Sequence, residues 1–172
     1  NHPNSRTMRA DLMNLLPEDV EKEIGSSSID VIIGGPPCQG FSIAGKRIID
    51  DERNKLYKSF VRMVEYFKPK AFVMENVPNI LSMGDGIIRE SIVKDFESLG
   101  YKVTTKVLLA SNYGVPQNRR RAVFVGLSNG KEFEYPEPKT QIPVTSRDAI
   151  SDLPEQSLAE GSLYPIEPQS KF

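Results

Sequence analysis

Along the first hundred residues of the chain, short apolar runs alternate with segments whose apolar residues recur at helical spacing. Residues 29–33 and 71–74 are apolar runs rich in branched or aromatic side chains, which is typical of buried strands. Residues 54–67 and 87–99 carry apolar positions at helical spacing, and residues 17–24 indicate a shorter helix with proline in its first turn. The order strand, helix, strand, helix predicts a parallel sheet with helices packed on its faces.

The pattern then changes. Residues 101–110 and 122–127 are both rich in β-branched side chains, and the segment between them is too short for a crossover helix with its loops. We therefore expect an antiparallel strand pair in this part of an α/β fold. From residue 128 prolines become frequent and the periodicity is lost, which indicates a domain boundary, a linker or the edge of a second domain.

Composition and charge narrow the class of protein. A length of 172 residues suffices for one domain with a real core. The net charge is −1, so a surface that binds nucleic acid must be local or lie outside this chain. A single cysteine excludes an internal disulfide and suits a reducing, cytoplasmic compartment. No apolar run is long enough to span a membrane and no signal peptide opens the sequence, so no membrane partner is expected.

Cys38 stands in the most informative segment, Gly-Gly-Pro-Pro-Cys-Gln-Gly-Phe-Ser at 34–42. Glycines and prolines end the preceding strand and form a stiff loop, and loops at the carboxyl ends of parallel strands are where α/β sheets bind ligands. A lone cysteine is more often a small buried side chain. The flanking Gly-Gly-Pro-Pro and the polar exit nevertheless favour a nucleophile.

Glu75 follows the apolar run 71–74. A carboxylate next to a buried strand is costly unless it is paired or hydrogen-bonded. Glu75 is therefore a candidate proton donor, although a carboxylate that caps the following turn explains the residue equally well.

A cluster of arginines directly precedes the last apolar run, in the segment 117–121. A charge run is usually a solvated face. Arg119 and Arg121 share parity, however, so an extended segment would place both guanidinium groups on one side. Such a pair suits a carbonyl, a carboxylate or a phosphate.

The segments 35–42, 75–77 and 117–121 together resemble three signature motifs of the DNA (cytosine-5)-methyltransferases, in the family's order and spacing. The resemblance runs through residues 1–127. It implies a Rossmann-like sheet of the S-adenosylmethionine-dependent methyltransferases, incomplete here, with the antiparallel pair in its C-terminal part.

The resemblance also implies a reaction, the transfer of a methyl group from S-adenosylmethionine to carbon 5 of cytosine in DNA. By match, Cys38 is the nucleophile that adds to carbon 6, and Glu75 contacts ring nitrogen 3 and the exocyclic amine. Arg121 would hold the carbonyl oxygen at position 2, and Arg119 would orient the loop or bind phosphate. The expected partner is double-stranded DNA with a flipped cytosine. A bacterial restriction-modification system, located at the nucleoid, is the family-level expectation, and no metal is implied.

Further residues match the family's cofactor positions. Asp11 would accept a hydrogen bond from the adenine amine of S-adenosylmethionine, and Leu12 would pack on the ring. Pro37 and Leu56 match positions that line the cofactor pocket, although Leu56 fits a simple place in the helix core nearly as well.

Other residues match positions that face DNA. Gln39 and Ser42 correspond to places where the catalytic loop meets DNA phosphate. Arg53, before the long helix, fits a phosphate-binding or structural role.

The family's remaining motifs are expected outside this sequence. Its glycine-rich cofactor loop and ribose-binding acid should precede residue 1, and its target-recognition domain should follow residue 172. The segment 145–154 resembles the lead-in to that domain. The resemblance thus identifies 1–138 as the central part of the catalytic domain and 139–172 as a linker and the start of the recognition region, so this fragment alone is expected to be inactive.

Alternative functions stay open at this point. A tRNA cytosine-5 methyltransferase of the same fold would carry the same motifs. A catalytically silent nucleic-acid-binding homologue would tend to lose Cys38 or Glu75, and both are present. A cysteine hydrolase needs a histidine base, and the only histidine is His2, which argues against it.

Overall fold

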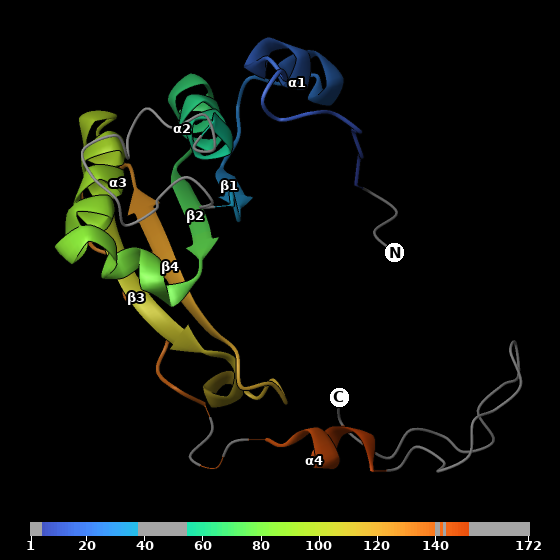
Figure 1. Cartoon of the computed structure of the whole chain (residues 1–172). Helices are drawn as coiled ribbons and strands as arrows, with labels where there is room; N and C mark the ends of the chain where they lie inside the picture. The colour runs from blue at the N-terminus through green and yellow to red at the C-terminus, as the bar shows by residue number, and fades with distance from the viewer. Residues whose placement is uncertain (1–4, 38–54, 140–141, 143, 152–172) are drawn as a thin grey trace, which may run out of the picture. The chain divides into compact units, whose positions relative to one another are not determined.

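The computed structural model describes residues 5–37, 55–139, 142 and 144–151. Figure 1 shows helices beside a small sheet. The elements in chain order are α1 (Pro17–Ile24), β1 (Val31–Gly34), α2 (Lys55–Phe67), β2 (Ala71–Asn76), η2 (Pro78–Leu81), η3 (Met83–Gly86), α3 (Ile87–Ser98), β3 (Lys102–Leu109), η4 (Ala110–Tyr113), β4 (Arg120–Leu127) and α4 (Ser146–Ile150). The first helix has the predicted bounds, and Gly25 ends it in the left-handed conformation at φ 70°.

The four strands form one mixed sheet in the order β1-β2-β4-β3. β1 is parallel to β2, with Val31 opposite Ala71, and β2 is antiparallel to β4, with Phe72 opposite Gly126. β3 and β4 are neighbours, and their arrows point in opposite directions in Figure 1. The predicted parallel pair and the predicted antiparallel pair are thus both present.

The core lies between the sheet and the helices α2 and α3. Phe72 and Met74 of β2 and Phe124 of β4 are fully buried there, together with Ile92 and Phe96 of α3. Phe72 stacks on Phe96 with ring centroids 4.0 Å apart. Because alternate side chains of a strand point to opposite faces, the odd-numbered residues of β2 point away from this core.

β2 and β4 both extend beyond the apolar runs that predicted them. β2 continues through Glu75 to Asn76, because both residues still pair with β4. β4 begins at Arg120, two residues earlier than predicted. Glu75 therefore stands within the strand, on the face opposite the core, rather than directly after the strand.

The chain divides into two compact units. The first comprises Asn1–Val107 with Arg121–Tyr135, and the second comprises Leu108–Arg120 with Pro136–Phe172. In the second unit, α4 begins with a capping box made by Thr145 and Asp148. The expected domain boundary after residue 138 stays a prediction.

Two findings apply to the described residues alone. No helix in this part of the chain is long and apolar enough to cross a bilayer. Nor do these residues contain a group of three or more histidine, cysteine or acidic side chains that could hold a metal ion.

Candidate active site

A carboxylate and a guanidinium meet where β2 ends and β4 begins. Arg121 Nε forms an ion pair with Glu75 Oε1. Glu75 stands opposite Val123 in the antiparallel ladder, so Arg121, two residues earlier on the same face of β4, is its diagonal neighbour. The Glu75 side chain is 41% exposed and that of Arg121 is 26% exposed, so an incoming group can reach the pair. The structure thus brings these two predicted site residues together, and their catalytic roles stay predictions.

Asn76 ties the end of β2 to the loop that follows β1. Its side chain is on the buried face of the strand, with the residue 6% exposed. Asn76 Nδ2 donates to the carbonyl of Pro36 at 2.9 Å, and its Oδ1 accepts from the backbone N–H of Val77 at 2.9 Å. This amide therefore fixes the backbone two residues before Cys38 against the strand that carries Glu75.

Two glycines allow close contacts to this loop. A Cβ on Gly35 would lie 3.1 Å from Glu75 Oε2, and one on Gly34 would lie 2.7 Å from a ring carbon of Phe60. Phe60 also packs edge-on against Phe72, with ring centroids 6.2 Å apart, so its ring has little room to move. Because both glycines lack a side chain, α2 can lie directly against the end of β1, and β2 can lie directly against the loop.

A cavity of about 280 Å³ opens beside the same loop. Its lining residues come from the turn after Asp11, β1, the loop and α2: Leu12, Ile32, Ile33, Gly34, Gly35, Pro36, Pro37, Leu56, Ser59, Phe60 and Met63. Leu12, Pro37 and Leu56, predicted from three separate segments to contact one cofactor, thus line one cavity. Its walls are mostly apolar, which suits the flat face of a purine ring.

Asp11 begins the turn that carries Leu12. Its Oδ1 accepts from the backbone N–H of Met13 at 3.0 Å, and its Oδ2 accepts from Asn14 Nδ2 at 2.9 Å. Its backbone carbonyl accepts from the N–H of Leu15 at 2.9 Å. Because a carboxylate oxygen can accept more than one hydrogen bond, this exposed carboxylate can also accept from an adenine amine.

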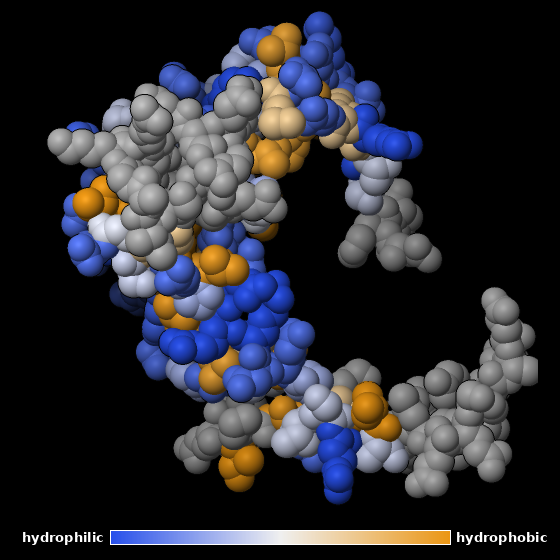
Figure 2. Space-filling model, viewed as in Figure 1, coloured by the Kyte–Doolittle hydropathy of each residue, from blue (hydrophilic) through white to orange (hydrophobic). Residues whose placement is uncertain are grey.

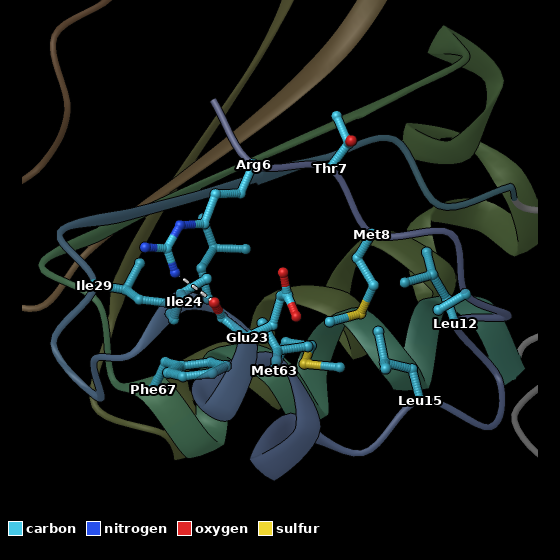
Figure 3. A pocket seen from close by; sticks show the side chains of 13 residues that line it. Arg6, Thr7, Met8, Leu12, Leu15, Glu23, Ile24, Ile29, Met63 and Phe67 are labelled. Carbon is cyan, nitrogen blue, oxygen red and sulfur yellow. Dashed lines mark hydrogen bonds between the residues drawn. The ribbon is translucent and has the colours of Figure 1, made fainter. Parts of the chain in front are cut away.

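A second apolar cavity, of about 340 Å³, shares Leu12, Ile32 and Met63 with the first. Figure 3 shows its walls, which come from the N-terminal segment, α1 and α2, with Met8 and Leu15 on the side of the N-terminal segment. Figure 2 shows apolar side chains at the surface beside α1, and Leu12 is 53% exposed. Leu12 therefore lines both of these neighbouring apolar cavities.

Several predicted site residues lie outside the described part of the chain, namely Cys38, Gln39, Ser42 and Arg53. The described loop ends at Pro37, so the structure places the start of the segment that carries the cysteine. Arg119 is exposed and directly precedes β4, but it belongs to the second unit. Its expected place beside Arg121 therefore stays a prediction.

Sequence reasoning missed Asn76, Phe60 and Met63 as parts of this site. A signal for Asn76 was available, because the alternation of Phe72 and Met74 puts the next inward position at an amide, and a buried amide needs partners. No signal separated Phe60 and Met63 from the other apolar side chains of α2, since an apolar position in a helix is usually a place in the core.

Comparison with known proteins decides the family. The profile described as C-5 cytosine-specific DNA methylase matches residues 8–168. This chain belongs to that family. Relatives include the Type II methyltransferase M1.HphI of Haemophilus parahaemolyticus, 45% identical over 95% of this chain, and M.DdeI of Desulfomicrobium norvegicum, 42% identical over 100%. The chain covers 45% and 44% of these proteins, so it spans about half the length of the curated relatives it matches.

Solved structures place the fold of this methylase chain. A prophage-encoded E. coli protein described as a DNA modification methyltransferase matches with a TM-score of 0.68 and 35% identity, covering 86% of this chain and 42% of that one. The S. pombe Dnmt2 methyltransferase matches with a TM-score of 0.52 and 17% identity, covering 90% of this chain and 43% of its own. At that identity the second likeness shows the fold alone. The methyltransferase sheet expected from the sequence is confirmed.

Proposed function

We propose that the whole protein transfers a methyl group from S-adenosylmethionine to carbon 5 of cytosine in double-stranded DNA. Its setting is a bacterial restriction-modification system acting at the nucleoid. The family and the Type II relatives support this proposal. The observation that carries it is the Glu75–Arg121 pair, which lies beside the loop that leads to Cys38.

The residues around the loop fit S-adenosylmethionine. Leu12, Pro37 and Leu56 offer apolar walls to an adenine ring, and Asp11 offers a carboxylate to its amine. Bound there, S-adenosylmethionine supplies an electrophilic methyl group. Because Gly34 and Gly35 lack side chains, Phe60 and Glu75 can lie directly against this backbone.

Cys38 makes the cytosine ring reactive. Carbon 5 of cytosine is a poor nucleophile, and addition of the Cys38 thiolate to carbon 6 gives carbon 5 the electron density of an enamine. After carbon 5 has gained the methyl group, loss of its proton and expulsion of the thiolate restore the carbon 5–carbon 6 double bond. Asn76 contributes by holding the backbone at Pro36, two residues before Cys38 in the sequence.

Glu75 and Arg121 hold the edge of the same ring. Glu75 binds ring nitrogen 3 and the exocyclic amine, and it favours protonation of the ring while the thiolate adds. Arg121 directs its guanidinium at the carbonyl oxygen at position 2, where negative charge grows. The ion pair orients both groups before the base arrives, which lowers the cost of ordering them during the reaction.

A covalent trap tests this proposal. The whole protein is mixed with S-adenosylmethionine and duplex DNA that contains 5-fluorocytosine, whose fluorine blocks the final elimination. We expect a DNA adduct at Cys38, located by mass spectrometry of peptides, and none with Cys38→Ser, which should still bind the duplex. An adduct only with fluorinated tRNA would move the substrate to RNA, and no adduct with either nucleic acid would refute the covalent mechanism.

A further inference from the structure

Arg62 reaches from the middle of α2 to the turn that begins at Asp11. Its Nη2 donates to the carbonyl of Leu15 at 2.9 Å and lies 3.4 Å from the carbonyl of Leu12. The contact joins residues 47 and 50 positions apart in the sequence. Arg62 is thus a long-range link between α2 and the N-terminal segment.

The environment of this guanidinium is unusual for a packing residue. Its Nε is buried and has no hydrogen-bond partner among the described residues. Within the same part of the chain, the partners recorded for Arg62 are carbonyl oxygens, with no carboxylate among them. A buried polar atom without a partner is costly, so an apolar side chain would fill this place at lower cost if packing were its sole role.

The turn that Arg62 holds carries two predicted cofactor contacts. Asp11 and Leu12 are its first residues, and both are exposed, with Leu12 at 53%. Hydrogen bonds within the turn fix its shape but do not attach it to the rest of the domain. The Arg62 contacts with Leu12 and Leu15 provide that attachment.

The helix that bears Arg62 forms the facing part of the same cavity. Leu56 and Met63 of α2 line the cavity together with Leu12. Figure 3, drawn at the neighbouring cavity of about 340 Å³, shows Leu12 and Leu15 on the N-terminal segment and labels Met63, a residue of α2. The Arg62 guanidinium therefore sets the spacing between one wall of the cavity and the other.

We infer that Arg62 is a positioning residue for the adenine-binding part of the cofactor site. It acts through the backbone of Leu12 and Leu15 and touches neither the cofactor nor the cytosine. This inference rests on the proposed function. Without the hydrogen bonds from Arg62, the turn must become ordered when the cofactor binds. The free-energy cost of that ordering weakens cofactor binding and leaves the chemical step unchanged.

Equilibrium binding tests this role. S-adenosylhomocysteine, which carries the adenosine but no transferable methyl group, is titrated calorimetrically into the whole protein and its variants. Arg62→Met keeps the apolar stem and removes the donors, and we expect binding about tenfold weaker, or about 1.4 kcal/mol at 25 °C. Arg62→Lys should recover part of the loss, because an ammonium can still donate to a carbonyl.

Tyr66→Phe is the matched control. Tyr66 lies one helical turn further along α2, and its hydroxyl bonds to Glu21 of α1. This variant loosens the link between α1 and α2 without touching the turn, so its affinity should stay within about twofold of the unchanged protein, or about 0.4 kcal/mol. In steady-state methylation, Arg62→Met should raise the KM for S-adenosylmethionine and leave kcat nearly unchanged.

The outcomes separate the inference from the proposed function. If the unchanged protein does not bind S-adenosylhomocysteine, the proposed function fails. If it binds, and Arg62→Met binds equally well or no worse than Tyr66→Phe, the role of Arg62 is refuted. If Arg62→Met does not fold, the test is made with Arg62→Lys. If that variant binds S-adenosylhomocysteine as tightly as the unchanged protein but has a lower unfolding midpoint, Arg62 is a purely structural residue.

Discussion

Asn76→Asp is the sharpest test of how the fold positions the loop before Cys38. The substitution keeps the shape of the side chain and keeps an oxygen for the N–H of Val77. It replaces the Nδ2 donor, which lies 2.9 Å from the carbonyl of Pro36, by a second oxygen. A donor–acceptor contact thereby becomes a contact between two acceptors at a site that is 6% exposed.

The expected loss in the free energy of unfolding follows from the lost hydrogen bond and the buried charge. Leaving a buried acceptor without its donor costs about 1–3 kcal/mol, and an ionised carboxylate at this place adds to that cost. We therefore expect the free energy of unfolding to fall by about 2 kcal/mol or more. The effect on catalysis is expected to be larger, because a displacement of about 1 Å at a reacting group can cost about a hundredfold in rate.

Two measurements on the whole protein check this prediction. Urea unfolding gives the change in stability, and the rate of adduct formation with 5-fluorocytosine DNA gives the effect on the cysteine. Asn79→Ala is a suitable control, because Asn79 is exposed in the η2 turn close to Asn76, with its Oδ1 3.4 Å from Ser82 Oγ. Adduct formation by Asn76→Asp at the rate of Asn79→Ala would show that the Pro36 contact does not position the thiol.

Further substitutions test other parts of the site. Glu75→Gln should slow methyl transfer by about a hundredfold or more, with little change in the urea midpoint because the ion pair is partly exposed. Gly34→Ala should cost about 1–3 kcal/mol by overpacking against Phe60, and Phe60→Leu in the same protein should recover part of it, as a double-mutant cycle would measure. Burial raises the pKa of Tyr135 to about 12, so the folded state favours the neutral phenol. The contribution of Tyr135 to the free energy of unfolding should then be fully present below the unfolded pKa of about 10 and be lost as the pH rises towards 12. Tyr135→Phe should flatten that loss of stability in urea titrations.

The sequence predicted the elements that depend on local patterns. The helix at Pro17–Ile24 begins with a proline and ends at a glycine, and both of its bounds were predicted. The apolar spacing in α2 located that helix through its last residue, Phe67. Apolar spacing predicts a helix because one face of the helix packs on the core and the other face is exposed to water.

Strand lengths could not be read in the same way. Glu75 and Asn76 are polar, so the apolar run alone ended β2 too early. In the structure both residues stay in the strand because β4 pairs with them, and this partner comes from a segment about fifty residues later in the chain. Pairing of this kind depends on the neighbour as much as on the strand itself.

Strand order is what turns separate motifs into one site. The sequence identified Glu75 and Arg121 as candidate site residues, but the hydrophobic pattern does not predict which strands are neighbours. In the observed order, β4 lies between β2 and β3, and this places Arg121 diagonally across from Glu75. Had β3 taken that place, a strand of threonines, aliphatic residues and lysines, without an arginine, would have lain beside the carboxylate instead. The chemistry of the candidate site therefore depends on the insertion of β4 into the sheet, which brings the arginine to the carboxylate beside the loop that leads to Cys38.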